Sequence, residues 1–60
     1  MKLKAKRAEH GYTQAKVAEL LNISTSSYIH KENGDTQFSL DEVKRLLKIF
    51  NCQFEDIFLL

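Results

Sequence analysis

Proline is absent from this 60-residue chain, and cysteine and glycine are scarce, with one cysteine and two glycines. Because proline is absent, no residue lacks the backbone N–H that a helix interior requires. A single cysteine excludes an internal disulfide and fits a reducing compartment such as the cytoplasm. No apolar stretch approaches the roughly 20 residues of a membrane span, and no signal-peptide pattern begins the chain. We therefore expect a helical domain that does not enter a membrane.

The chain also lacks the residue patterns of enzymes and metal sites. A domain of this size buries only about 60% of the surface that its unfolded chain exposes, which leaves no room for an ordinary enzyme cleft. His10, His30 and Cys52 match no zinc-ligand spacing. The hydroxyls of residues 24–27 have no acid–base partner at a recognisable spacing, and no glycine-rich phosphate loop is present. We predict a single domain over residues 1–60, with no enzymatic activity, no metal and no cofactor.

The clearest pattern in the sequence is the helical spacing of its apolar residues. Apolar residues fall at spacings of three, four and seven, most clearly at Val43, Leu46, Leu47 and Phe50. No run of alternating β-branched residues indicates a strand. The expected turns contain residues that tolerate a left-handed conformation, namely Gly11, Asn22, Gly34 and Asn51. The sequence thus predicts an all-α fold with helices at about 2–10, 14–21, 25–32 and 40–50 and a short fifth helix after Gln53.

Residues 13–34, TQAKVAELLNISTSSYIHKENG, contain two short helical segments joined by a three-residue turn. Thr13 and Ser24 stand where N-cap residues begin each helix, because their hydroxyls can accept from free backbone amides. Asn22 lies at the reversal between the two segments. The apolar stripe of the first segment consists of Val17, Ala18 and Leu21, and Ile23 is expected to fill the space between the helices. This order is typical of a helix-turn-helix, whose second helix enters the major groove of DNA.

This segment resembles the helix-turn-helix of the Cro and repressor family of phage and bacterial transcription regulators. The similarity continues through Glu32-Asn33-Gly34 and through residues 40–43, 46–51 and 54–58, and it covers the chain from about Leu3 to Phe58. It implies a compact five-helix, lambda-repressor-like DNA-binding domain in the bacterial cytoplasm. It also implies a regulator of the repressor type that binds double-stranded operator DNA sequence-specifically. Family members commonly bind pseudo-palindromic operators as homodimers, and we expect the same here.

The charge distribution agrees with DNA binding better than the net charge of +1 does. Residues 1–34 carry six basic and three acidic side chains, whereas residues 35–60 carry three basic and five acidic ones. The positive half contains the helix-turn-helix, as attraction to phosphate requires. The alternative is that this uneven distribution of charged side chains has no functional role.

The recognition helix is expected at about residues 25–32, with its first turn entering the groove. Thr25 and Ser26 occupy that turn, where hydroxyls can bond to base edges and the Thr25 methyl can touch a thymine methyl. His30 lies one turn beyond Ser26 and can donate to guanine N7 or O6. The full set of predicted DNA-contacting residues is Gln14, Thr25, Ser26, Ser27, His30, Lys31, Asn33 and Lys6.

The remaining members of this set are predicted phosphate contacts. Gln14 begins the first helix of the unit, where its backbone amide and side chain can bind a phosphate at the positive end of the helix dipole. Ser27 and Asn33 are also placed for phosphates, and Lys6 and Lys31 add charge while their stems pack on the surface. The alternatives are plain solvent-facing lysines and, for the whole set, polar surface residues without a role.

Other residues have structural interpretations. The family resemblance implies an ion pair between Arg7 and Glu32 that sets the angle of the recognition helix, with two independent surface charges as the alternative. Tyr28 is expected on the inward face with its hydroxyl at the rim, within reach of a phosphate, rather than as a base-stacking aromatic. Phe38 is expected to pack from a loop into the core. Cys52 is expected to be a structural thiol.

Two further functions stay open. The chain could be the DNA-binding domain of a longer repressor, sensor or antitoxin, or a protein-interaction module that keeps the fold. The polar reading face argues against the second, since a protein-binding face would usually expose more apolar area. We predict a dimer surface at the apolar end of the chain, the alternative being that Phe58 completes the core. This surface comprises Ile57, Phe58, Leu59 and Leu60.

Overall fold

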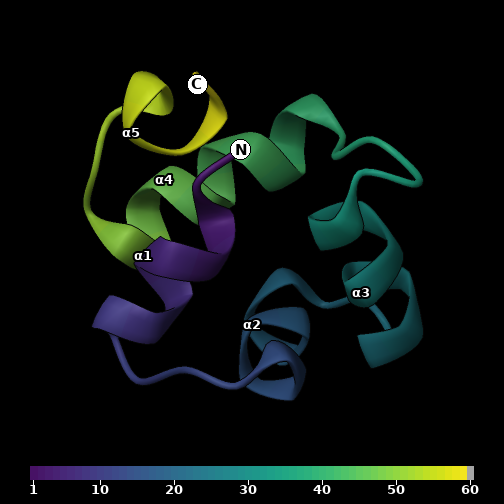
Figure 1. Cartoon of the computed structure of the whole chain (residues 1–60). Helices are drawn as coiled ribbons and strands as arrows, with labels where there is room; N and C mark the ends of the chain where they lie inside the picture. The colour runs from purple at the N-terminus through teal and green to yellow at the C-terminus, as the bar shows by residue number, and fades with distance from the viewer. Residues whose placement is uncertain (60) are drawn as a thin grey trace.

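The computed structural model describes residues 1–59, which form five helices and no strand (Figure 1). The helices are α1 (Leu3–Glu9), α2 (Gln14–Leu21), α3 (Thr25–Asn33), α4 (Leu40–Phe50) and α5 (Phe54–Phe58). The predicted all-α, five-helix architecture is therefore confirmed, with α1 slightly shorter and α3 one residue longer than predicted. In this part of the chain, no helix is long and apolar enough to cross a membrane.

Side-chain caps explain where three of the helices begin. The Thr13 hydroxyl accepts from the backbone N–H of Lys16 at 3.0 Å, and the Ser24 hydroxyl accepts from that of Ser27 at 3.1 Å. Ser39 and Glu42 form a reciprocal capping box at the start of α4, with each side chain accepting from the other residue's backbone N–H. The predicted caps of α2 and α3 are thus confirmed.

Left-handed residues explain where the helices end. Asn22, at φ 61°, closes α2, and Gly34, at φ 87°, closes α3. Gly11 and Asn51 also have positive φ, as predicted. Past Asn22, the Ile23 N–H donates to the Ala18 carbonyl at 3.0 Å, which binds the turn to the last part of α2. The chain therefore reverses within three residues between α2 and α3.

The core lies between α2 and the helices around it. α2 packs against α3 and α4, and α1 packs against α5 (Figure 1). The Phe38 ring reaches the core from the loop before α4, with its centroid 6.2 Å from that of Tyr28, as predicted. Val43 is half-buried and lines a surface groove, whereas the other apolar residues predicted for α4 pack in or against the core. The buried hydrophobic residues are Leu3, Val17, Ala18, Leu21, Tyr28, Leu46, Phe50 and Ile57.

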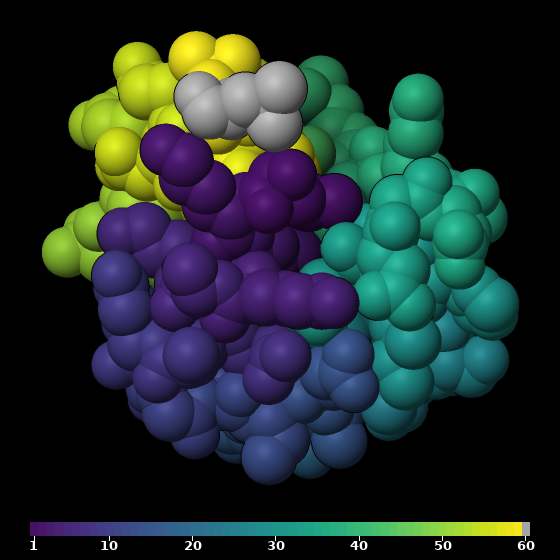
Figure 2. All heavy atoms as spheres, in the orientation of Figure 1, coloured from purple at the N-terminus to yellow at the C-terminus, as the bar shows by residue number. Residues whose placement is uncertain are grey.

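The beginning of the chain is joined to α5. The backbone N–H of Lys2 donates to the Ile57 carbonyl at 2.7 Å. Figure 2 shows the first residues, in purple, against the yellow end of the chain, with the teal α3 region at one side of the molecule. On α3, the side chains of Thr25, Ser26, His30 and Asn33 are exposed.

Candidate nucleic-acid interface

The recognition helix α3 has one buried and one exposed face. Tyr28 and Glu32, four residues apart, point inward and are buried. Thr25, Ser26 and His30 are exposed, and the last two are also four residues apart. The helix therefore presents Ser26 and His30 to solvent on the face opposite Tyr28, and it exposes Thr25 at its first turn.

The buried side of α3 is anchored to α1 by an ion pair. Arg7 donates through Nε to Glu32 Oε2 at 2.9 Å and through Nη2 to Glu32 Oε1 at 3.3 Å. The side chain of Glu32 is 0% exposed and that of Arg7 is 20% exposed. Arg7 also donates from Nη1 to the Tyr12 carbonyl at 3.0 Å, which fixes the guanidinium plane. The ion pair that the family resemblance implied is present, in the two-pronged geometry that favours arginine over lysine.

Two further donors complete the surroundings of Glu32. The Tyr28 hydroxyl donates to Oε2 at 2.6 Å, and the Gln14 side-chain amide donates to Oε1 at 2.9 Å. The predicted position of the Tyr28 hydroxyl at the rim is therefore wrong, because Glu32 holds it in the interior. Gln14 is half-buried, and one of its side-chain N–H groups is committed to this network.

The network also decides the ionisation of its members. Burial raises the pKa of the Glu32 carboxyl, but the hydrogen bonds from Arg7, Tyr28 and Gln14 outweigh burial and leave this pKa below its ordinary value. Burial and the hydrogen bond to Glu32 raise the pKa of the Tyr28 phenol far above its ordinary value. Glu32 is thus a carboxylate and Tyr28 a neutral donor at neutral pH.

Lys31, the neighbour of Glu32, is held by a different helix. Its Nζ lies 2.7 Å from Glu42 Oε1 on α4, and its side chain is only 17% exposed. The ammonium also lies 5.9 Å from the centroid of the Phe38 ring. The solvent-facing alternative for Lys31 is therefore wrong, and any phosphate contact must share the ammonium with Glu42.

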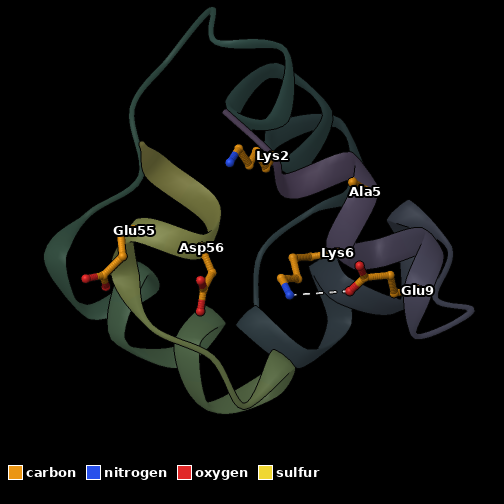
Figure 3. Close-up of a pocket in the computed structure, with 6 residues that line it drawn as sticks. All are labelled: Lys2, Ala5, Lys6, Glu9, Glu55 and Asp56. Carbon is orange, nitrogen blue, oxygen red and sulfur yellow. Dashed lines mark ion pairs between the residues drawn. The ribbon is translucent and has the colours of Figure 1, made fainter. Parts of the chain in front are cut away.

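Lys6 lies with residues of α1 and α5 rather than with those of α3. Figure 3 shows its side chain in an open hollow that is also lined by Lys2, Glu55 and Asp56. Its Nζ lies 3.4 Å from Glu9 Oε2, and the dashed line in Figure 3 marks this ion pair. The structure thus does not bring Lys6 into one group with Thr25, Ser26 and His30.

The other predicted contacts lie along α3. Ser27 is half-buried, and Asn33 is exposed at the last turn. The exposed His30 ring has its Nδ1 3.2 Å from Asp35 Oδ2 in the loop that follows the helix. Cys52 is half-buried against the core, and this burial raises the pKa of its thiol, in agreement with a structural role.

Sequence reasoning missed the partners of Gln14, Lys31 and His30. The contact between Tyr28 and Glu32 could have been predicted from the sequence, since residues four apart meet on one face of a helix. Gln14 and Glu32 are 18 residues apart, and Lys31 and Glu42 are 11 apart, so only the packing of helices joins them. His30 and Asp35 meet because the chain turns back at Gly34.

Comparison with known proteins shows the family to which the chain is related. The chain matches the helix-turn-helix family over residues 3–57. Over 50 residues it is 42% identical to a Pyrococcus horikoshii protein that carries the name of an HTH-type transcriptional regulatory protein, covering 83% of this chain and 16% of that protein. Over 54 residues it is 37% identical to the competence pilus inhibition repressor of Acinetobacter baylyi, covering 90% of this chain and 49% of that repressor. The chain thus spans half or less of the length of these relatives.

The family match includes every helix of the described structure. It begins at the first residue of α1 and ends within α5. The predicted resemblance to helix-turn-helix transcription regulators is confirmed, and with it the prediction that this domain belongs to DNA-binding regulators and not to enzymes. The 60-residue chain belongs to the helix-turn-helix family.

Proposed function

We propose that this domain binds a specific double-stranded DNA sequence, as a transcription regulator of the repressor type, with α3 in the major groove. The observation that carries the proposal is the two-sided character of α3. Its inner face is fixed to α1 by the Arg7–Glu32 ion pair, whereas Thr25 at its first turn and Ser26 and His30 on its outer face are exposed. A rigidly held helix with polar side chains on its free face suits the reading of base edges.

The first turn of α3 is the part proposed to lie deepest in the groove. Thr25 and Ser26 are its first two residues and are exposed, so their hydroxyls are available to base edges. The same face continues to His30, one turn farther along. Exposed Asn33, at the last turn, and half-buried Ser27 are proposed phosphate contacts.

Phosphate contacts are also proposed for Gln14, Lys31 and Lys6. Each of these side chains already binds a glutamate within the domain, which competes with a phosphate. Gln14 begins α2, so its backbone amide can bind a phosphate while its side chain stays bonded to Glu32. Lys31 is paired with Glu42, and Lys6 is paired with Glu9. We infer that Gln14 holds the register on DNA through its backbone, and that the lysines act mainly through their charge.

Selection of random duplexes on the purified protein tests sequence-specific binding. One sequence is expected to be enriched, and Thr25→Ala or His30→Ala is expected to weaken that site by about 1–3 kcal/mol while changing non-specific binding little. Thr36→Ala is the matched control, since Thr36 is an exposed threonine outside α3. The Thr36→Ala variant should rank the bases in the same order as the wild type. Enrichment without any sequence preference would show that the proposed function is wrong.

A salt titration separates the two roles open to Lys31. If its ammonium contacts a phosphate, Lys31→Ala weakens all duplexes alike and lowers the slope of log affinity against log salt by about one. If Lys31 serves only its ion pair with Glu42, the free energy of unfolding falls and the slope stays unchanged. Lys44→Ala, which removes an exposed lysine of α4, is the control for a change of net charge alone.

We propose that two copies bind together on a pseudo-palindromic operator. The Cα atoms of the domain extend over 24 × 22 × 18 Å, less than the roughly 34 Å between half-sites one turn of DNA apart. One copy therefore reads one half-site. Two half-sites with two-fold symmetry match two copies of the same surface.

A protein-interaction module is the weaker candidate. The exposed part of α3 argues against it, since Thr25, Ser26 and His30 are polar, whereas a protein-binding face usually exposes more apolar area. The DNA-binding proposal is the same whether this domain acts alone or as part of a longer repressor.

A further inference from the structure

We propose that Asp35 fixes the tautomer of His30, so that Nε2 of the neutral ring accepts from an exocyclic amino group of adenine or cytosine and does not read guanine. The inference rests on the proposed function, since it assumes that α3 lies in the major groove. It changes the role expected for His30 from the sequence, which was donation to guanine N7 or O6. Asp35 thereby becomes a specificity-determining residue without touching DNA.

The geometry begins at the end of α3. Gly34 takes the left-handed conformation, and the Asp35 backbone N–H donates to the His30 carbonyl at 2.9 Å. This backbone bond holds Asp35 beside the helix end, where Asp35 Oδ2 lies 3.2 Å from His30 Nδ1. The side chains of His30 and Asp35 are 58% and 62% exposed. The pair therefore stands on the surface that the DNA would approach.

The carboxylate of Asp35 determines which nitrogen of His30 carries the hydrogen. An ionised carboxylate only accepts hydrogen bonds, so a bond to Asp35 requires the hydrogen of His30 to be on Nδ1. In a neutral imidazole the other nitrogen, Nε2, then has a free lone pair and can only accept. Adenine N6 and cytosine N4 present donors in the major groove, whereas guanine N7 and O6 present acceptors. Nε2 of neutral His30 thus matches an amino group and opposes guanine.

No other charged partner of the ring is seen in the described part of the chain. The neighbouring charges of α3 are directed elsewhere, with Lys31 bound to Glu42 and Glu32 bound to Arg7. Asp35, from the loop before α4, is the charged group within hydrogen-bond distance of the ring. Exclusion of water by DNA would strengthen this bond, because hydrogen bonds gain strength in a low dielectric.

The test measures equilibrium binding to four duplexes that differ only at the base pair whose identity His30→Ala affects most. The proteins are the wild type, Asp35→Ala and Glu55→Gln, the last removing an exposed negative charge on α5. At about pH 8 the wild type and Glu55→Gln are expected to prefer adenine or cytosine over guanine. Asp35→Ala frees Nδ1, allows the hydrogen to move to Nε2, and is expected to reduce that preference about fivefold to tenfold.

The outcomes separate this inference from the proposed function. A wild type without any preferred duplex contradicts the proposed function. A preferred duplex whose base ranking is the same in Asp35→Ala contradicts the inference alone. Preference for guanine by the wild type at about pH 8 also overturns it. Circular dichroism checks that Asp35→Ala is folded, which we expect because the Asp35 backbone bond is kept.

Discussion

Four donor groups from three helices converge on the carboxylate of Glu32. They are Nε and Nη2 of Arg7 on α1, Nε2 of Gln14 on α2, and the hydroxyl of Tyr28 on α3 itself. A buried charge is costly unless it is paired and fully hydrogen-bonded, and here it is both. Glu32 therefore ties the recognition helix to both α1 and α2.

Glu32→Gln is expected to lower the free energy of unfolding by about 3–5 kcal/mol, because it leaves the partly buried Arg7 without a counter-charge. Urea denaturation followed by circular dichroism measures the change. Glu19→Gln is the control, since Glu19 forms an exposed pair with Lys16 and should change stability by less than about 1 kcal/mol. Equal stability of the two variants would contradict the structural role of Glu32.

The carboxylates of Glu32 and Glu42 also predict how stability depends on pH. Burial raises the pKa of Glu42, but hydrogen bonds from Lys31 and from the Ser39 backbone outweigh burial, so its pKa is lower in the folded state than the ordinary 4.5. A pKa lowered by folding contributes stability above the unfolded value, and this contribution disappears as the pH falls through the folded value. The same sign holds for Glu32. Unfolding temperatures measured from pH 7 to pH 2 should therefore decrease below about pH 4.5, and less steeply in Glu42→Gln. An identical profile for both proteins would show that Glu42 does not contribute.

At the scale of elements, α3 is tethered at its last turn to two different helices. Lys31 binds Glu42 on α4, and the next residue, Glu32, binds Arg7 on α1. Because successive helix residues point about 100° apart, the two ion pairs restrain rotation of α3 from two sides. The face that carries Ser26 and His30 is thus kept pointing outward.

The turn between α2 and α3 gives a prediction about backbone conformation. Asn22 has φ 61° and is exposed, so Asn22→Gly should be neutral or slightly stabilising, and Asn22→Ala should cost about 1 kcal/mol. Asn33→Ala is the control, since Asn33 lies within α3, where alanine is favourable. Thermal unfolding measures all three variants. A stable Asn22→Ala would contradict the left-handed turn on which the motif depends.

At the scale of the whole molecule, the structure corrects the predicted dimer surface. Ile57 is buried in the core and Phe58 packs against it, so Ile57 is unavailable to a partner, and Leu60 lies outside the described residues. Phe54 and Leu59 remain exposed at this end of the molecule, 47% and 55% respectively. An apolar groove lies beside them, lined by Met1, Phe38, Val43, Phe54 and Phe58 among others. We expect two copies to meet over this region.

Leu59→Ser is expected to weaken self-association without lowering the stability of the monomer, because Leu59 is exposed. Sedimentation should show a weak dimer for the wild type in solution, and a complete dimer on an operator duplex. Leu20→Ser is the control, since Leu20 is an exposed leucine on α2. A monomer in sedimentation, together with a footprint of one unpaired half-site, would contradict the dimer.

The sequence by itself determined where the helices of the motif begin and end, and which face of α3 turns inward. Thr13 and Ser24 accept from backbone amides three residues on, and Asn22 takes a conformation that few residues tolerate. Tyr28 and Glu32 share a helix face because they are four residues apart. All of these effects act over one turn of helix, so they can be read from neighbouring residues.

Only the tertiary structure decided which partners the charged and polar side chains of the site take. Lys31 was expected near phosphates or solvent, yet it binds Glu42 because α4 passes beside the end of α3. The Tyr28 hydroxyl was expected at the rim, yet it is buried, because its partner Glu32 is also bound by Arg7 and Gln14 of two other helices. Long side chains can reach several partners, and their choice depends on how separate helices pack against each other. Residue spacing along the chain carries no information about that packing.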